Sequence, residues 1–161
     1  MPRHTHTFGR LLSASQLPYF QLRPPHDYGV LTTTGHKTGK HRSRCVRVVR
    51  RGDKAFLVAI GGKRNHWAKN ILANPHVRLR LRAGRFLGVA SEIPAEERNE
   101  ARESYAADVH WFERLEWRVW RKGGFTPEQS RELHRHWFDT GLPFVVKLTD
   151  ARAPQAHANN S

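Results

Sequence analysis

Residues 31–44, LTTTGHKTGKHRSR, and residues 59–75, AIGGKRNHWAKNILANP, are the two stretches that decide the fold of this chain. Each begins as an apolar, strand-like run. The backbone can then turn tightly and approach a ligand closely at four glycines, Gly35, Gly39, Gly61 and Gly62. The adjacent cations, which favour a phosphate-bearing ligand, are Lys37, Lys40, Arg42, Lys63 and Arg64. The pattern predicts an anion-binding site, but not a P-loop, because the Gly-Lys-Ser/Thr ending is missing and the glycines are spaced differently.

Short runs rich in Val, Ile, Leu and Phe predict six strands along the chain. The turn at Arg51-Gly52-Asp53 indicates that the second and third strands form an antiparallel hairpin, and the turn at Ala83-Gly84 indicates a second hairpin. The expected strands are 30–34, 45–49, 56–60, 77–82, 86–90 and 144–148.

Helical periodicity predicts two or three helices beside these strands. A short helix is expected over 67–72, and a long one follows Pro94 with apolar residues from Ala101 to Val119. Thr126-Pro127-Glu128-Gln129 supplies an N-cap, a first-turn proline and a capping-box glutamine for a further helix. The sum is an α+β chain, mostly β, whose strands form a small barrel or curled sheet with helices at its side.

The chain of 161 residues suits one domain, which we expect over residues 17–150, with a tail or short helix at 1–16 and a tail at 151–161. The single Cys45 favours a reduced, cytoplasmic location and a buried, inert thiol. No run is apolar enough to span a membrane. A basic N-terminal helix that rests on a membrane stays open as the alternative to one that packs on the domain.

The net charge of +14, from 28 Lys plus Arg against 14 Asp plus Glu, favours anionic partners. A basic nucleic-acid-binding module is one reading, in which the arginine row Arg78, Arg80, Arg82 and Arg85 follows phosphates. The water-facing side of a half-buried sheet would look the same, and the tryptophans do not alternate with these arginines as stacking platforms would. The histidines lack zinc-site spacing, so we expect no metal.

These motifs resemble the deazaflavin-dependent nitroreductase and quinone reductase family, whose fold is a split β-barrel. The family has the sequence Leu-Thr-Thr-Thr-Gly, which falls here on Leu31–Gly35. A basic loop that ends in Thr/Ser-Gly follows, here His36–Gly39, and an arginine stands three residues later, here Arg42. It also has a Gly-Gly pair, a Trp and an Asn-Leu-x-Ala-Asn-Pro ending. Here these are Gly61-Gly62, Trp67 and residues 70–75, with Ile71 in place of the leucine.

The resemblance implies that coenzyme F-420 is bound, with FMN or haem as alternatives that similar barrels hold. Lys37, Arg42 and Asn70 match family positions at the coenzyme phosphate, while the two glycines would admit the ring and Trp67 would pack near the ring or in the core. The full set of expected cofactor residues is Lys37, Thr38, Gly39, Lys40, Arg42, Ala59, Ile60, Gly61, Gly62, Lys63, Trp67 and Asn70. Relatives often have cations where this chain has His36 and Ile60, so Lys40, Lys63 and Arg64 are expected to substitute.

The implied activity is an oxidoreductase that transfers hydride from the reduced coenzyme to a small-molecule acceptor: a quinone, a nitro compound or an activated alkene. Tyr105 and His66 are the candidate proton donors, with His110 and solvent as alternatives. Nucleic acid is the less favoured partner, and both a homodimer and peripheral membrane contact stay open.

Overall fold

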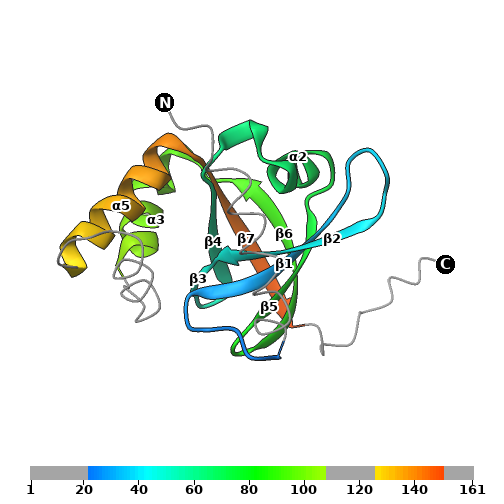
Figure 1. Ribbon diagram of the computed structural model, residues 1–161, viewed down its shortest axis with the longest axis horizontal. Helices are drawn as coiled ribbons and strands as arrows, with labels where there is room; N and C mark the ends of the chain where they lie inside the picture. Colours follow the sequence, from blue (N-terminus) through cyan, green and yellow to red (C-terminus); the bar gives the residue numbers. More distant parts are fainter. Residues whose placement is uncertain (1–21, 108–125, 151–161) are drawn as a thin grey trace.

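The protein is described by a computed structural model over residues 22–107 and 126–150, and its main element is one seven-stranded sheet (Figure 1). The strand order is β2-β1-β5-β6-β7-β4-β3, and all six neighbouring pairs are antiparallel. The strands are β1 Tyr28–Thr34, β2 His41–Arg47, β3 Val49–Arg51, β4 Lys54–Ala59, β5 His76–Leu81, β6 Gly84–Glu92 and β7 Leu142–Asp150.

The sheet curls because its two edge strands, β2 and β3, are consecutive in the chain. Only Val48 separates them, and its amide donates to the carbonyl oxygen of Asp27 at 2.9 Å rather than to a strand partner. The expected single strand over 45–49 is therefore wrong: the chain bends at Val48, and the sheet has seven strands instead of six. The curled half-barrel confirms the predicted α+β fold, and both predicted hairpins are present as β3–β4 and β5–β6.

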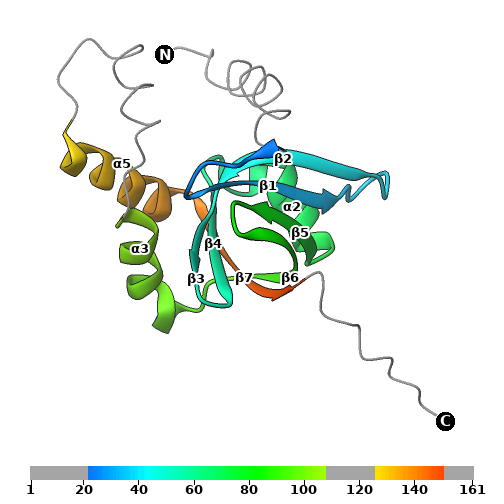
Figure 2. The same ribbon diagram turned by 90° about the horizontal axis from the view of Figure 1, so that it is seen from below.

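The barrel interior is apolar and one end of it is covered by a helix, α2, which spans His66–Ala73 (Figures 1 and 2). Leu31, Leu57 and Leu79 point into the barrel from β1, β4 and β5, while the residues next to them along each strand point to the other face of the sheet. Trp67, Ala68 and Ile71 of α2 join the same apolar cluster. The helix is thus fixed by its inner face, while the residues of its other face stay available beside the loops.

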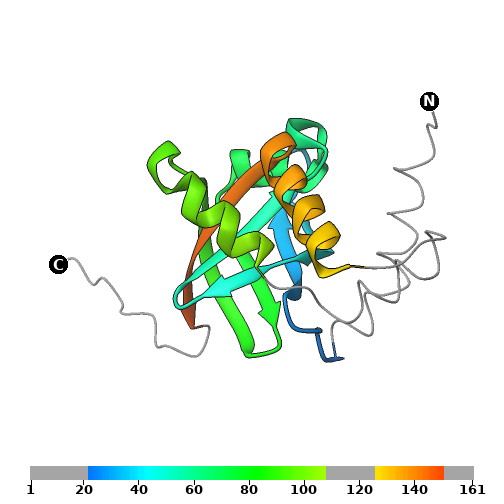
Figure 3. The same ribbon diagram turned by 90° about the vertical axis from the view of Figure 1, so that its left-hand side faces the viewer.

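A second apolar cluster lies outside the barrel, where α3, Arg98–Ala106, and α5, Pro127–Thr140, lie in front of the sheet in Figure 3. Val49, Phe56 and Val58 of β3 and β4 supply its sheet side. The capping box predicted at Thr126 is present, with Thr126 and Gln129 bonded reciprocally. The longer helix expected as far as Val119 is described only as far as Ala106, and the remainder lies outside the described residues.

Pro143 stands inside β7, although it has no amide hydrogen for a sheet ladder. It pairs with Val58 of β4, whereas the pairing of β7 with β6 begins one residue later, at Phe144. The position is compatible with proline because β7 has only one partner strand there. Over residues 22–107 and 126–150, no helix is long and apolar enough to cross a membrane, and no group of three or more His, Cys, Asp or Glu could hold a metal ion.

Candidate functional site

The first motif forms a compact loop between β1 and β2 that is closed by its own hydrogen bonds. The amide of Gly35 donates to the carbonyl of Lys40 at 2.8 Å, and the amide of Gly39 donates to the carbonyl of Gly35 at 2.8 Å. Gly39 has φ 66°, a conformation that residues with a side chain rarely adopt. Lys40 donates its amide to the hydroxyl of Thr38 at 3.4 Å. These amides are engaged within the loop, whereas the side chains of Lys37 and Lys40 are exposed.

Asn70 joins this loop to α2. Its side chain is 5% exposed, and its Oδ1 accepts from the backbone N–H of His36 at 3.0 Å and lies 2.8 Å from the Nδ1 of His36. Its Nδ2 donates to the hydroxyl of Thr33 at 2.9 Å. An amide oxygen only accepts, so Nδ1 of His36 carries the hydrogen and Nε2 is the ring nitrogen left for other partners. One residue of α2 therefore fixes both the end of β1 and the start of the cationic loop.

The second motif leaves β4 at Ala59 and turns into α2. Gly62 has φ 58° and opens a single 3-10 turn, Gly62–Arg64, while Asn65 caps α2 by accepting from the amide of Trp67 at 3.3 Å. Lys63 and Arg64 are exposed. Ile60 is also exposed, with 52% of its surface accessible.

The cations of both motifs have no acidic partner within the residues that the structure describes. In this part of the chain, five side chains form neither an ion pair nor a hydrogen bond: those of Lys37, Lys40, Arg42, Lys63 and Arg64. Cations that gather without carboxylates create a positive field that an anionic ligand relieves. We call these five residues the cationic cluster.

The space beside the glycines fits a phosphate-bearing ligand. A Cβ atom added at Gly39 or Gly62 would meet no atom within 4 Å, so the backbone is open to an approaching group at both turns. Guanidinium and ammonium groups are the protein donors that suit phosphate and carboxylate oxygens. The residues present therefore fit a coenzyme with a phosphate and an acidic tail.

Trp67 and Ala59 lie in the barrel core. Trp67 is 6% exposed and its ring centroid lies 5.8 Å from that of Phe144, while Ala59 is fully buried. Of the two placements expected for Trp67, near the ring or in the core, the structure shows the core. Thr38 and Gly39 lie on the loop surface, and Gly61 and Gly62 are half-buried. Cys45, expected to be buried, is half-buried on β2.

Tyr105 is not brought together with the cationic cluster. It is 1% exposed in the outer apolar cluster, where its ring lies 6.0 Å from that of Phe138 and 6.0 Å from that of His134. Arg47 donates to its carbonyl oxygen at 3.1 Å. His66, by contrast, is exposed at the first position of α2, next to the second motif. His110 lies outside the described residues.

Thr33 and His36 are the members of the site that sequence reasoning missed. Thr33 is 1% exposed and holds the amide of Asn70, yet in the sequence it is one of three threonines in a strand. His36 was noted only as a missing cation, whereas it bonds twice to Asn70, 34 residues away. No local pattern marks either role, because both depend on where α2 meets β1.

The comparison with known protein families gives one match, to the model for F420H(2)-dependent quinone reductase, over residues 18–119. The chain belongs to this family. It is therefore a reductase that uses coenzyme F-420, and FMN and haem are minor alternatives. The match includes β1, the β1–β2 loop, β4 and α2, which carry or adjoin the residues of both motifs.

Solved structures share the split-barrel fold. One described as an F420-H2 dependent reductase (FDR-A) is 24% identical, over 74% of this chain and 92% of that chain, with a TM-score of 0.48. One described as a domain-swapped dimer is 21% identical, over 83% and 93%, with a TM-score of 0.50. A putative pyridoxamine 5'-phosphate oxidase from Listeria innocua is 17% identical, over 86% and 92%, with a TM-score of 0.42. No curated protein matches the chain.

Proposed function

We propose that this reductase transfers hydride from reduced coenzyme F-420 to a quinone, and that the cationic cluster holds the coenzyme. The observation that carries the proposal is the bonding of Asn70 to His36 and Thr33, because it holds the loop of Lys37 against α2. Asn70 is thus a positioning residue. This contact joins the β1–β2 loop to α2, and the two motifs supply five cations whose side chains pair with no acidic group among the described residues.

Each part of the site has a separate role in binding. Lys37 and Arg42, with Lys40, Lys63 and Arg64, neutralise the phosphate and the acidic tail of the coenzyme. Gly61 and Gly62 leave open backbone where a flat ring can approach. Ile60 offers an exposed apolar surface at the same turn, which suits contact with a ring or an apolar acceptor.

The reduced coenzyme supplies a hydride when bound, so the reaction is a two-electron transfer in which the coenzyme is oxidised and the acceptor is reduced. A quinone that receives one hydride and one proton becomes the quinol, and the electrons balance without a further oxidant. The protein orients the two partners and excludes water between them. His66, exposed beside the second motif, is the better placed of the two expected proton donors, and Tyr105 is buried under α5.

Titration of the full-length protein with coenzyme F-420, followed by the coenzyme's fluorescence, tests this proposal. A Lys37→Gln, Arg42→Gln variant removes two charge-assisted contacts, each worth about 1.5–3 kcal/mol, so we expect its affinity to fall at least tenfold. The matched control is Arg131→Gln, Lys147→Gln, which removes the same charge from exposed or half-exposed positions on α5 and β7. Equal losses in both variants would mean that only the overall field matters.

The acceptor is tested separately, with the reduced coenzyme and a quinone, a nitroaromatic compound and an activated alkene at equal concentration. We expect the highest kcat/KM with the quinone. Tight coenzyme binding with turnover only on the nitro compound or the alkene would keep the coenzyme assignment and replace the acceptor. Binding without turnover on any of the three would contradict the proposed reaction.

A further inference from the structure

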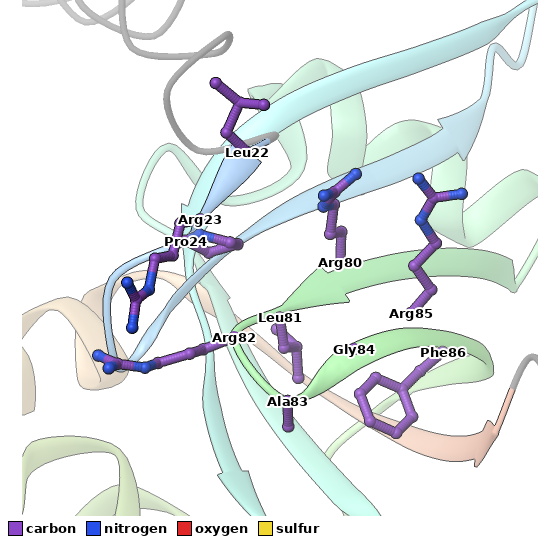
Figure 4. A pocket seen from close by; sticks show the side chains of 10 residues that line it. All are labelled: Leu22, Arg23, Pro24, Arg80, Leu81, Arg82, Ala83, Gly84, Arg85 and Phe86. Carbon is purple, nitrogen blue, oxygen red and sulfur yellow. The ribbon is translucent and has the colours of Figure 1, made fainter.

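A second cationic region lies at the turn between β5 and β6. Here the surface is hollowed over about 660 Å³ (Figure 4). Four arginines from three segments line this hollow, together with apolar groups that include Leu81 and Phe86. The four are Arg23, which precedes β1, Arg80 and Arg82 of β5 and its turn, and Arg85 of β6. We call them the arginine hollow.

The strand register places like charges opposite each other in this hollow. Arg80 pairs with Arg85 across β5 and β6, and both side chains rise from the same side of the hairpin in Figure 4. Arg82 lies in the turn that follows β5, and in Figure 4 its side chain extends in a different direction from those of Arg80 and Arg85. Like charges directly opposite on neighbouring strands destabilise a sheet.

None of these four guanidinium groups is compensated within the part of the chain that the structure describes. No ion pair and no side-chain hydrogen bond involves Arg23, Arg80, Arg82 or Arg85. The α5 arginines behave differently, since Arg131 and Arg135 each pair with Glu128. A water-facing arginine row needs neither a hollow nor a fourth arginine from another segment, so the arrangement exceeds what the sheet alone requires.

We propose that the arginine hollow binds a compact anion with two phosphate groups, such as a diphosphate ester. Four guanidinium charges match the three to four negative charges of a diphosphate, and each guanidinium can donate two parallel hydrogen bonds to phosphate oxygens. The volume lies within the range of about 300–1,000 Å³ that is usual for small-molecule sites. Leu22, which lines the hollow and is 81% exposed, offers apolar contact for the organic part of such an ester.

This site is separate from the cationic cluster. Arg80 pairs with Val30, and the cationic loop begins five residues further along β1, at Gly35, a distance of about 16 Å along an extended strand. Figure 1 shows the β1–β2 loop and the β5–β6 turn at opposite ends of the barrel. The hollow therefore binds a group of its own.

Single-stranded nucleic acid fits the hollow less well. Binding of single strands relies on exposed aromatic side chains for stacking. The large exposed apolar side chains of the described residues are Leu22, Ile60, Leu72 and Val89, none of which is aromatic. Phe86, the aromatic residue at the hollow, is 8% exposed and lies under the guanidinium of Arg50, at 4.4 Å.

The test uses inorganic pyrophosphate as the probe and isothermal titration calorimetry as the measurement. The full chain carries Lys37→Gln and Arg42→Gln, so that the cationic cluster does not contribute. Adding Arg80→Gln and Arg85→Gln should weaken pyrophosphate binding at least tenfold, whereas adding Arg131→Gln and Lys147→Gln should change it less than twofold. In the otherwise native chain, Arg80→Gln, Arg85→Gln should leave coenzyme F-420 affinity within twofold.

A stability measurement keeps the proposal testable independently of affinity. In phosphate-free buffer of low ionic strength, Arg85→Gln should raise the midpoint of thermal unfolding, because it relieves the repulsion with Arg80. Pyrophosphate should raise the unfolding midpoint of the native protein but not that of the Arg85→Gln variant. Binding to vesicles of phosphatidylglycerol, compared with vesicles of phosphatidylcholine, distinguishes a lipid headgroup from a free phosphate compound as the ligand. Binding to the anionic vesicles without binding to pyrophosphate would contradict the proposal, because phosphatidylglycerol carries a single phosphate.

Three outcomes would overturn the proposal. One is absence of binding to pyrophosphate, whether or not the anionic vesicles bind. Another is an equal loss in the Arg131→Gln, Lys147→Gln control, which would indicate the general field of the protein. The third is a salt-sensitive complex with a single-stranded oligonucleotide that is lost in the Arg80→Gln, Arg85→Gln variant but is not displaced by pyrophosphate.

Discussion

The side-chain oxygen of Asn70 lies 3.0 Å from the backbone nitrogen of His36 and 2.8 Å from its Nδ1, so a buried helix residue holds the loop that carries Lys37. The same amide donates to Thr33, and the three residues form one small network between α2 and β1. The loop of the proposed coenzyme site is thus supported by a residue whose own hydrogen-bonding groups are largely engaged inside the protein.

Replacement of Asn70 by alanine should weaken both folding and coenzyme binding. The change leaves the Thr33 hydroxyl and the His36 amide without their partner, which costs about 1–3 kcal/mol of unfolding free energy. The loop loses its support, so we expect coenzyme affinity to fall about tenfold, which corresponds to about 1.4 kcal/mol. Denaturant unfolding and a fluorescence titration measure the two effects.

Asn74→Ala is the matched control for this change. Asn74 is also an asparagine of α2, at its C-terminal cap, where its side chain accepts from the amide of His76 at 3.1 Å. We expect a loss of stability of up to about 1 kcal/mol with little change in coenzyme affinity. Equal affinity losses in the two variants would show that Asn70 acts only through helix stability.

Trp67 should act through the barrel core and not through the coenzyme. Trp67→Ala removes a large buried side chain from its packing against Phe144, and such truncations cost about 3–5 kcal/mol. Trp67→Phe retains most of the packing, so we expect coenzyme affinity within about twofold of the native value, equivalent to less than about 0.5 kcal/mol. A tenfold loss in the well-folded Trp67→Phe protein would place the indole at the ligand.

Tyr105 and His66 should differ in their effect on turnover. Tyr105 is buried between the sheet and α5, so Tyr105→Phe should leave kcat unchanged, whereas His66→Gln should lower it about tenfold if the imidazole supplies the proton. Steady-state kinetics with a quinone, measured across pH, separates the two. A large loss of kcat in Tyr105→Phe at native stability would reverse this assignment.

The contact between α3 and α5 should weaken in acid. Arg102 bonds both oxygens of Asp139, through Nε at 2.9 Å and Nη2 at 2.8 Å, and this hydrogen bonding, followed by the positive charge, lowers the pKa of Asp139. Arg135, through its hydrogen bond and charge, lowers the pKa of Glu103. A carboxylate with a lowered pKa stabilises the folded state above its unfolded-state pKa and loses this effect as the pH falls through its folded-state pKa.

Thermal unfolding of the native chain and of Arg102→Gln between pH 7 and pH 3 measures this contribution. Exposed pairs of this kind are worth about 0.2–1 kcal/mol, so the native chain should be slightly more stable at pH 7. The difference should shrink below about pH 4, where the carboxylates become protonated. A difference that stays constant down to pH 3 would exclude the ion pair as its cause.

The fold could be predicted to a large extent because its signals are local. Alternation in Val77–Leu81, the turn at Gly84 and the capping box at Thr126 each depend on a few neighbouring residues, and each appears as expected. The bend at Val48 could not be predicted, because it arises where the chain passes from one edge of the curled sheet to the other. Residues 45–49, four apolar residues around Arg47, do not show such a bend in their sequence.

The sequence by itself determined the two glycine-rich cationic motifs, the likeness to the deazaflavin-dependent reductases and the elements of the barrel, since these depend on residue type and spacing along the chain. Only the tertiary structure decided that Asn70 supports the loop of His36, that Trp67 fills the barrel core and that Tyr105 lies away from the cationic cluster. It also decided that Arg23 joins the arginines of the β5–β6 hairpin. The physical reason is that hydrogen bonds and burial join residues that are tens of positions apart, and the curled sheet sets which of them meet.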